Sequence, residues 1–296
     1  MNRPICLLLL ALASFGADAQ RVGKPPTVAL IAAIGDQVDV VRQRERTGSH
    51  AEPFSRKSLA INGRLLNMAV LKGLNQAIEE EEPLAQRVLL NWTAPADTQA
   101  QLAQAHGKER EAIILSALQA HLRAMPSRAD WDRIEAILPS YFYAGFGGMG
   151  SKLSGVGFYV QPLDKGAAAV PWEADAPDGA TADMVAETGS GYRTVNPRTG
   201  EVGSSNTYIA AYMYFERVTL DARSLDVIAR KRQLDNVKYA DPEATALDVG
   251  DQVPLKVMAG KLLTLAERSA YVSVRGASQV FVTAPKPLSS GASAPR

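Results

Sequence analysis

Two acidic residues on either side of a tryptophan are the first candidates for chemistry in this chain. Asp130 and Asp132 flank Trp131, and Glu135 follows closely. Paired carboxylates hydrolyse glycosides when they face each other across a cleft. Side chains two residues apart on a strand lie on one face, so we expect Asp130 and Asp132 to share a face. The alternative is a solvated turn that is anchored by Trp131.

A glycine-rich stretch follows these carboxylates, Gly145-Phe146-Gly147-Gly148-Met149-Gly150. It matches the G-x-G-x-x-G pattern, whose glycines let the backbone approach the pyrophosphate of a dinucleotide at a helix N-terminus. The residues after it predict a strand rather than the required helix, so we expect no dinucleotide cofactor. A binding loop and a purely structural connection both fit. If the loop binds a ligand, the candidate residues are Tyr143, Gly145, Phe146, Gly147 and Gly150.

The familiar nucleophile and metal motifs are missing from the sequence. Gly35-Asp36 follows an apolar run, as in the Gly-Asp-Ser block of SGNH hydrolases, but Gln37 occupies the place of the serine nucleophile. Neither a G-x-S-x-G elbow nor an S-x-x-K motif is found. We expect His121 to pack within its helix and His106 to lie at a helix end. His50, His106 and His121 do not have the spacing of metal ligands, so we expect no metal site.

The N-terminus has the pattern of a secretory signal. Arg3 precedes the apolar run Ile5–Leu12, and Ala17-Asp18-Ala19 supplies an A-x-A cleavage site. The run is too short to cross a bilayer. Cleavage would also remove Cys6, the only cysteine, and leave a chain without thiol chemistry. We therefore expect a periplasmic or secreted protein whose mature chain has no transmembrane segment; the alternative is a buried N-terminal helix.

Charge and composition limit the remaining options. The net charge is only +1, so no basic field points to nucleic acid. Because 46% of the residues are hydrophobic, a substantial core is possible. We predict a signal peptide over 1–19 and one α/β domain over 20–283. Residues 164–206 are poor in large apolar side chains, which predicts a surface excursion, and 284–296 form a tail rich in Pro, Ser and Ala that we expect to be disordered.

Hydrophobic periodicity predicts alternating strands and helices, which is typical of a mixed α/β sheet flanked by helices. The predicted strands are Thr27–Ile34, Gln37–Arg42, Arg87–Trp92, Arg133–Leu138, Gly155–Val160 and Ala270–Val274. The predicted helices are Arg64–Ile78, a stretch capped by Asp97, Lys108–Ala124 and one through Leu255–Leu265. Gly35 suits the turn of a β-hairpin between the first two strands. The acids of Glu79–Glu82 oppose the helix dipole, so we expect the first helix to end before them.

The most apolar segment, Tyr208–Phe215, predicts a strand buried on both faces. Asp221–Ser224 is typical of a turn, and a second strand should return from it. We expect the basic run Arg230–Arg232 to end that strand at an exposed sheet edge, where like charges discourage pairing with another chain. Met213 and Phe215 should therefore lie in the core of the protein.

The strand sequences TVALIAAI, GVGFYVQPL and YIAAYMYFERVTLDARSLDVIAR resemble the layout of CsgG/TolB-N-type envelope proteins. The turn Asp221–Val227 is similar to the "D-a-x-t-x-x-v" turn of that group. The likeness extends over Thr27–Leu234, but this chain lacks a lipobox and adds the 164–206 excursion. The resemblance implies a non-catalytic role in the cell envelope and supplies no catalytic residue. We therefore expect the partner to be a cell-envelope protein or glycan; a hydrolase with a carboxylate site near the glycine loop is the alternative.

Overall fold

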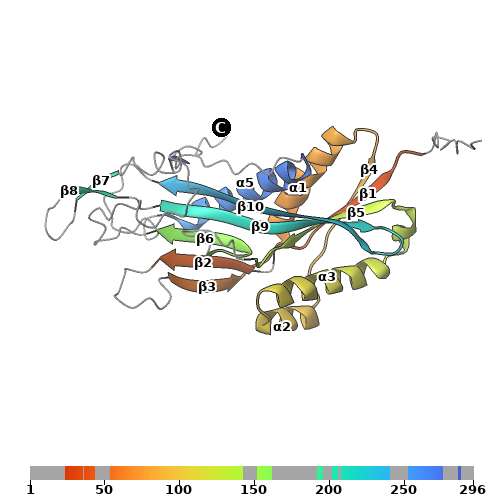
Figure 1. Ribbon diagram of the computed structural model, residues 1–296, viewed down its shortest axis with the longest axis horizontal. Coiled ribbons are helices and arrows are strands. Elements are labelled where there is room, and N and C mark those ends of the chain that lie inside the picture. The colour runs from red at the N-terminus through yellow and green to blue at the C-terminus, as the bar shows by residue number, and fades with distance from the viewer. Residues whose placement is uncertain are drawn as a thin grey trace, which may run out of the picture.

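The fold is α/β, with a mixed β-sheet flanked by helices (Figure 1). The computed structural model describes residues 24–35, 37–43, 54–142, 152–161, 192–195, 202–205, 208–240, 253–275 and 286–287. The strands are β1 (Thr27–Ala32), β2 (Gln37–Gln43), β3 (Phe54–Ala60), β4 (Gln86–Leu90), β5 (Arg133–Pro139), β6 (Val156–Gln161), β7 (Tyr192–Val195), β8 (Val202–Ser205), β9 (Tyr208–Asp221), β10 (Val227–Ala240) and β11 (Lys286–Pro287). The helices are α1 (Arg64–Glu81), α2 (Ala96–Gln104), α3 (Lys108–Arg123), α5 (Leu255–Val274) and the short 3-10 helix η1 (Pro126–Asp130).

The long strand β9 organises the main sheet. Along one edge it pairs with β10 over nearly its whole length. Along its other edge it pairs first with β6 and then with β5, and both run antiparallel to it. The order across the sheet is β3-β2-β6-β9-β5-β1-β4. Within the predicted excursion, β7 and β8 form a separate two-stranded sheet.

Two pairs of strands continue one another along the sheet instead of folding back. β5 and β6 lie in line on the same edge of β9, and β1 and β2 pair in parallel with β5 and β6 respectively. The predicted hairpin at Gly35 is therefore wrong. Gly35 serves a close approach instead, because a Cβ added there would lie 2.4 Å from the Cα of Gly63.

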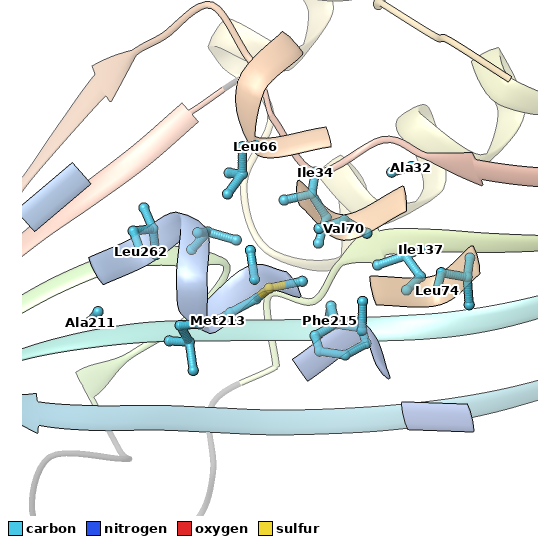
Figure 2. Close-up of a cluster of buried hydrophobic side chains, with 14 of the residues drawn as sticks. Ala32, Ile34, Leu66, Val70, Leu74, Ile137, Ala211, Met213, Phe215 and Leu262 are labelled. Atoms are coloured by element: carbon cyan, nitrogen blue, oxygen red, sulfur yellow. The ribbon is translucent and has the colours of Figure 1, made fainter. Parts of the chain in front are cut away.

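Helices cover both sides of the sheet, which we call the α1/α5 face and the α2/α3 face (Figure 1). On the α1/α5 face, Met213 and Phe215 of β9 point into the same cluster as Val70 of α1 and Leu262 of α5 (Figure 2). Met213 and Phe215 are both 0% exposed, which confirms that this strand is a wall of the core. Because side chains alternate along β9, Tyr212 and its even-numbered neighbours face the other way.

The predicted β9–β10 hairpin and its turn are confirmed. The Asp221 carboxylate accepts hydrogen bonds from the amides of Arg223 and Ser224 at 2.9 and 2.7 Å, which holds the turn. The basic run Arg230–Arg232, however, does not end β10, which continues to Ala240. Arg230 and Arg232 are tolerated within the strand because both bind Glu216 on β9, at 3.1 and 2.6 Å.

The first helix is longer than the sequence predicts, since α1 includes the acids up to Glu81. Basic residues offset the unfavourable dipole: Arg87 binds Glu79 at 2.9 Å, and Arg275 binds both Glu80 and Glu81. These acids are therefore ion-paired rather than simply solvated.

The predicted strand over Ala270–Val274 is also wrong, because this segment forms the last turns of α5. Its small residues explain the difference: Ala270 is buried against the core of the α1/α5 face, and Ser273 is fully buried beside it. The strands β1, β2, β4, β5 and β6 and the helix α3 lie within a few residues of their predicted bounds. Asp97 lies in the first turn of α2 and does not cap it, since the cap position is Pro95. The strand β3 was not predicted, and the short strand β11, which pairs with β10, falls within the tail that was expected to be disordered. No helix in the described part of the chain is long and apolar enough to span a membrane.

Candidate functional site

The predicted carboxylate pair, Asp130 and Asp132, lies outside any strand. Asp130 ends η1 and Asp132 precedes β5, so the two do not share a strand face, and both are exposed. Asp132 joins β1 to β5 instead: its carboxylate accepts a hydrogen bond from the Thr27 amide at 2.7 Å, and its amide donates to the Thr27 carbonyl at 2.9 Å. Trp131 is buried beneath this turn, as expected for an anchor.

These carboxylates are also distant from the point where the glycine loop leaves the sheet. Asp132 precedes β5, whereas the loop follows its end. β5 has 7 residues, and a strand rises about 3.3 Å per residue, so roughly 20 Å separates the two points. The loop candidates Tyr143, Gly145, Phe146, Gly147 and Gly150 lie outside the described residues, as does His50.

The structure describes two of the three histidines, His106 and His121, and only the predicted position of His106 is confirmed. His106 follows the end of α2, as expected. His121 is exposed, so its predicted packing within α3 is wrong. The buried stripe of α3 instead contains Ile114, Leu118 and Leu122, and His121 lies beside that stripe, near the helix C-terminus.

The junction between β5 and β6 is the strongest candidate for a functional site. Ser140 and Gly155 close the segment between these strands: the Gly155 amide donates to the Ser140 carbonyl at 2.7 Å. Both also bind Tyr214 of β9, because the Ser140 amide donates to the Tyr214 carbonyl at 2.8 Å and the Tyr214 amide donates to the Gly155 carbonyl at 2.8 Å. The sheet thus continues past the segment that contains the glycine loop.

Gly155 is required at this junction for two reasons. Its φ is +67°, in the left-handed region that favours glycine. A Cβ added there would also lie 3.0 Å from Cε1 of Tyr141, whose ring packs over the junction. The backbone and the close contact with Tyr141 therefore both require glycine at position 155, where the base of the loop closes.

The N-terminal flank of the loop is tied to α3 and to β10. Glu111 of α3 accepts hydrogen bonds from the Tyr141 amide at 2.5 Å and from the Ser140 hydroxyl at 3.3 Å. The guanidinium of Arg232 lies 4.3 Å from the centre of the Phe142 ring, a cation–π contact. This flank is therefore held in place up to Phe142, the last residue that the structure describes before the loop.

The C-terminal flank is tied to β2 and β3 by a buried ion pair. Arg56 binds Asp39 at 3.1 Å and also donates to the Ser154 hydroxyl at 2.7 Å and to the Lys152 carbonyl. Asp39 is only 3% exposed, and it accepts a further hydrogen bond from the Ser58 hydroxyl at 2.7 Å. Because a buried charge without a partner is costly, this pairing fixes Arg56 and hence the flank that it binds.

A group of tyrosines lines the sheet beside this ion pair, on the α2/α3 face. Burial, together with the negative charge of Asp39, raises the pKa of Tyr212 well above its usual value. Burial, with a contribution from Asp235, raises the pKa of Tyr214 to about 12. Both hydroxyls therefore stay protonated at neutral pH. The Tyr212 hydroxyl is buried and has no hydrogen-bond partner in the described part of the chain.

Sequence reasoning missed the Asp39–Arg56 pair. The available signal was the charge in Val38-Asp39-Val40, because a carboxylate between apolar strand residues has to be exposed or paired. Its partner, Arg56, lies on β3, a segment for which the sequence predicted no strand. The strand β3 forms because its side chains pair with those of β2, which a local pattern cannot indicate.

At this junction Asp39 and Arg56 form an ion pair, and Tyr212 and Tyr214 stay protonated. Among the described residues, no group of His, Cys, Asp and Glu side chains could hold a metal ion. Comparison with models of known protein families and with curated proteins finds no match for this chain.

Proposed function

We propose that this protein is a non-catalytic, exported protein that uses the glycine-rich loop 145–150 to bind another component of the cell envelope, a protein or a glycan. The observation that carries the proposal is the anchoring of both flanks of the loop. Ser140 and Tyr141 are tied to Glu111, and Lys152 and Ser154 are tied to Arg56.

A firmly held base suits a loop that recognises a partner. Binding residues are concentrated on loops positioned by a rigid scaffold. Fixing the ends of a loop in advance also reduces the conformational entropy that binding would otherwise remove. A connection that only joined β5 to β6 would not need these contacts, since the two strands already lie in line on β9.

The surface next to the loop has residue types that are common in protein interfaces. Phe142 is 38% exposed, and the side chain of Arg232 above its ring is 37% exposed. Aromatic residues and arginine are enriched at interfaces and often contribute most of the binding energy. An exposed phenylalanine with a stacked arginine therefore supports recognition at this end of the loop.

The non-catalytic and export parts of the proposal rest on separate grounds. The separation of Asp132 from the loop favours binding over hydrolysis by the predicted carboxylates. Export rests on the apolar run Ile5–Leu12 and the A-x-A site ending at Ala19. Mass spectrometry of periplasmic or secreted material should find an N-terminus at Gln20; a full-length cytoplasmic product would contradict export.

Site-specific photo-crosslinking in intact cells tests the binding role. p-Benzoylphenylalanine would replace Phe146 in the loop and, as a matched control, Leu84, which is 79% exposed and lies before the edge strand β4. We expect a discrete adduct from position 146, identified by mass spectrometry as an envelope protein or glycan, and none from position 84. The same adduct from both positions, or no adduct from position 146, would refute recognition by the loop.

A further inference from the structure

A second polar cluster lies on the other side of the sheet, where α1 and α5 end. Arg217 is two residues beyond Phe215 on β9, so its side chain is on the α1/α5 face. Lys231 on β10 is its direct partner in the antiparallel register and donates to the carbonyl of Ser273 in α5 at 3.0 Å. The cluster is therefore separate from the loop, whose C-terminal flank is anchored on the opposite face.

Arg217 and Lys231 place two positive charges side by side. Directly opposed residues of an antiparallel pair have Cβ atoms about 4.5–5.5 Å apart, and like charges at such positions are destabilising. The effect is visible in the pKa of Lys231, which is lowered by burial and by the charge of Arg217. The repulsion between Arg217 and Lys231 lowers the stability of the folded sheet, and a bound anion would offset it.

The neighbouring carboxylate is already occupied by other partners. Glu135 is 4% exposed, and its two oxygens accept hydrogen bonds from Arg133 at 3.2 Å and from the Thr219 hydroxyl at 3.0 Å. Arg217 approaches it only to 3.7 Å, an ion pair without a hydrogen bond. Arg133 is further bound by Glu82. The carboxylates near the pair are thus engaged chiefly with Arg133.

Arg217 and Lys231 both have N–H donors that make no hydrogen bond within the described part of the chain. The Arg217 side chain is 20% exposed and makes no hydrogen bond to any described residue, which leaves its planar set of donors open. Lys231 has one hydrogen bond, to Ser273, and no carboxylate partner among those residues. Solvent can reach the site, because Ala229, which lies two residues before Lys231 on the same side of β10, is exposed.

We propose that Arg217 and Lys231 form a binding site for one anionic group, a carboxylate or a phosphate, on the open sheet face beside Glu135. Arginine binds such groups through two parallel N–H bonds, and lysine adds a point charge. The anion would take the donors that Glu135 leaves unused and would neutralise the opposed charges. The site does not depend on the loop, so it holds or fails independently of the proposed function.

Isothermal titration calorimetry of the mature protein with sodium phosphate and, separately, with sodium acetate tests this site. Ionic strength is kept constant with sodium chloride, because screening alone would otherwise change the signal. We expect saturable binding of one anion per chain in at least one titration. The titration that saturates distinguishes a phosphate ligand from a carboxylate ligand.

Matched variants assign the binding to the pair. Arg217→Gln and Lys231→Gln should each weaken it by about tenfold or more, the usual scale for losing a hydrogen bond to a charged group. Arg223→Gln, which removes an exposed charge in the β9–β10 turn, should leave it unchanged. No saturable binding of either anion, or equal binding in the parent and in either Gln variant of the pair, would overturn the proposal.

Discussion

The carbonyl of Ser140 accepts a hydrogen bond from the amide of Gly155 at 2.7 Å and so closes the base of the segment that carries the glycine loop. Because of this contact, β5 and β6 continue as one line along β9. The loop is thus an insertion into a strand whose pairing does not depend on it, and the following predictions rest on that arrangement.

Asp39→Ala should strongly destabilise the protein. It would leave Arg56, whose side chain is 23% exposed, without its carboxylate, and removing one partner of a buried ion pair costs about 3–5 kcal/mol. Ser58→Ala removes only one neutral donor to Asp39 and should cost about 1 kcal/mol. Urea unfolding of both variants checks this. Equal, small losses would show that the ion pair does not hold the flank of the loop.

Phe215→Ala should lower stability by about 3–5 kcal/mol, because it removes a fully buried ring and leaves a cavity between β9 and the α1/α5 layer. Lys57→Ala on the edge strand β3 is the control and should change stability by about 0.5 kcal/mol or less. Lys231 would be unsuitable as a control, since it is bound to Ser273. Thermal melting of both variants decides the matter, and a Phe215→Ala protein that melts like the parent would refute the core assignment.

Asp221 should make the stability of the β9–β10 turn depend on pH. The amides of Ser224 and Arg223 lower its pKa below the usual value. A lowered pKa in the folded state means that the stabilisation is present above the unfolded pKa and is lost as pH falls through the folded one. The melting temperature of Asp221→Asn should therefore lie below that of the parent at pH 7, and the gap should close in acid. A gap that is constant with pH would contradict this.

Asp132→Ala should reduce the stability of the protein. If the parent shows any hydrolase activity, the variant should keep it. The variant loses the charge-assisted hydrogen bond from the Thr27 amide, which is worth about 1.5–3 kcal/mol. Asp130→Ala is a suitable comparison, because Asp130 is exposed at the end of η1. A broad hydrolase screen and thermal melting of both variants test the assignment. Reproducible hydrolysis by the parent that disappears in Asp132→Ala would favour the hydrolase alternative.

The sequence predicted elements well where one segment determines its own environment. Tyr208–Phe215 has no polar side to expose, so its burial follows from composition, and Asp221 forms its turn with its own neighbours. Predictions failed where distant partners decide the outcome. Glu81 stays helical because of Arg275, and β10 continues through Arg232 because of Glu216.

The candidate site was predictable only in part, for the same reason. The glycine-rich loop stands out in the sequence, but its anchors come from β2, β3 and α3, which are far away along the chain. The pairing of Asp39 with Arg56 depends on the register between β2 and β3. No local pattern could indicate that register, since the sequence did not predict β3 as a strand.

The claim that the loop serves recognition rather than the fold is tested most directly by thermal unfolding of a variant in which Gly145–Gly150 is replaced by two glycines. The residues that anchor the flanks, Tyr141 and Lys152, are unchanged in this variant, and removing a few residues from a loop changes its closure entropy only slightly. We predict one cooperative transition within a few degrees of the parent. A much lower or non-cooperative transition would show that the loop is part of the folded core and would contradict the account.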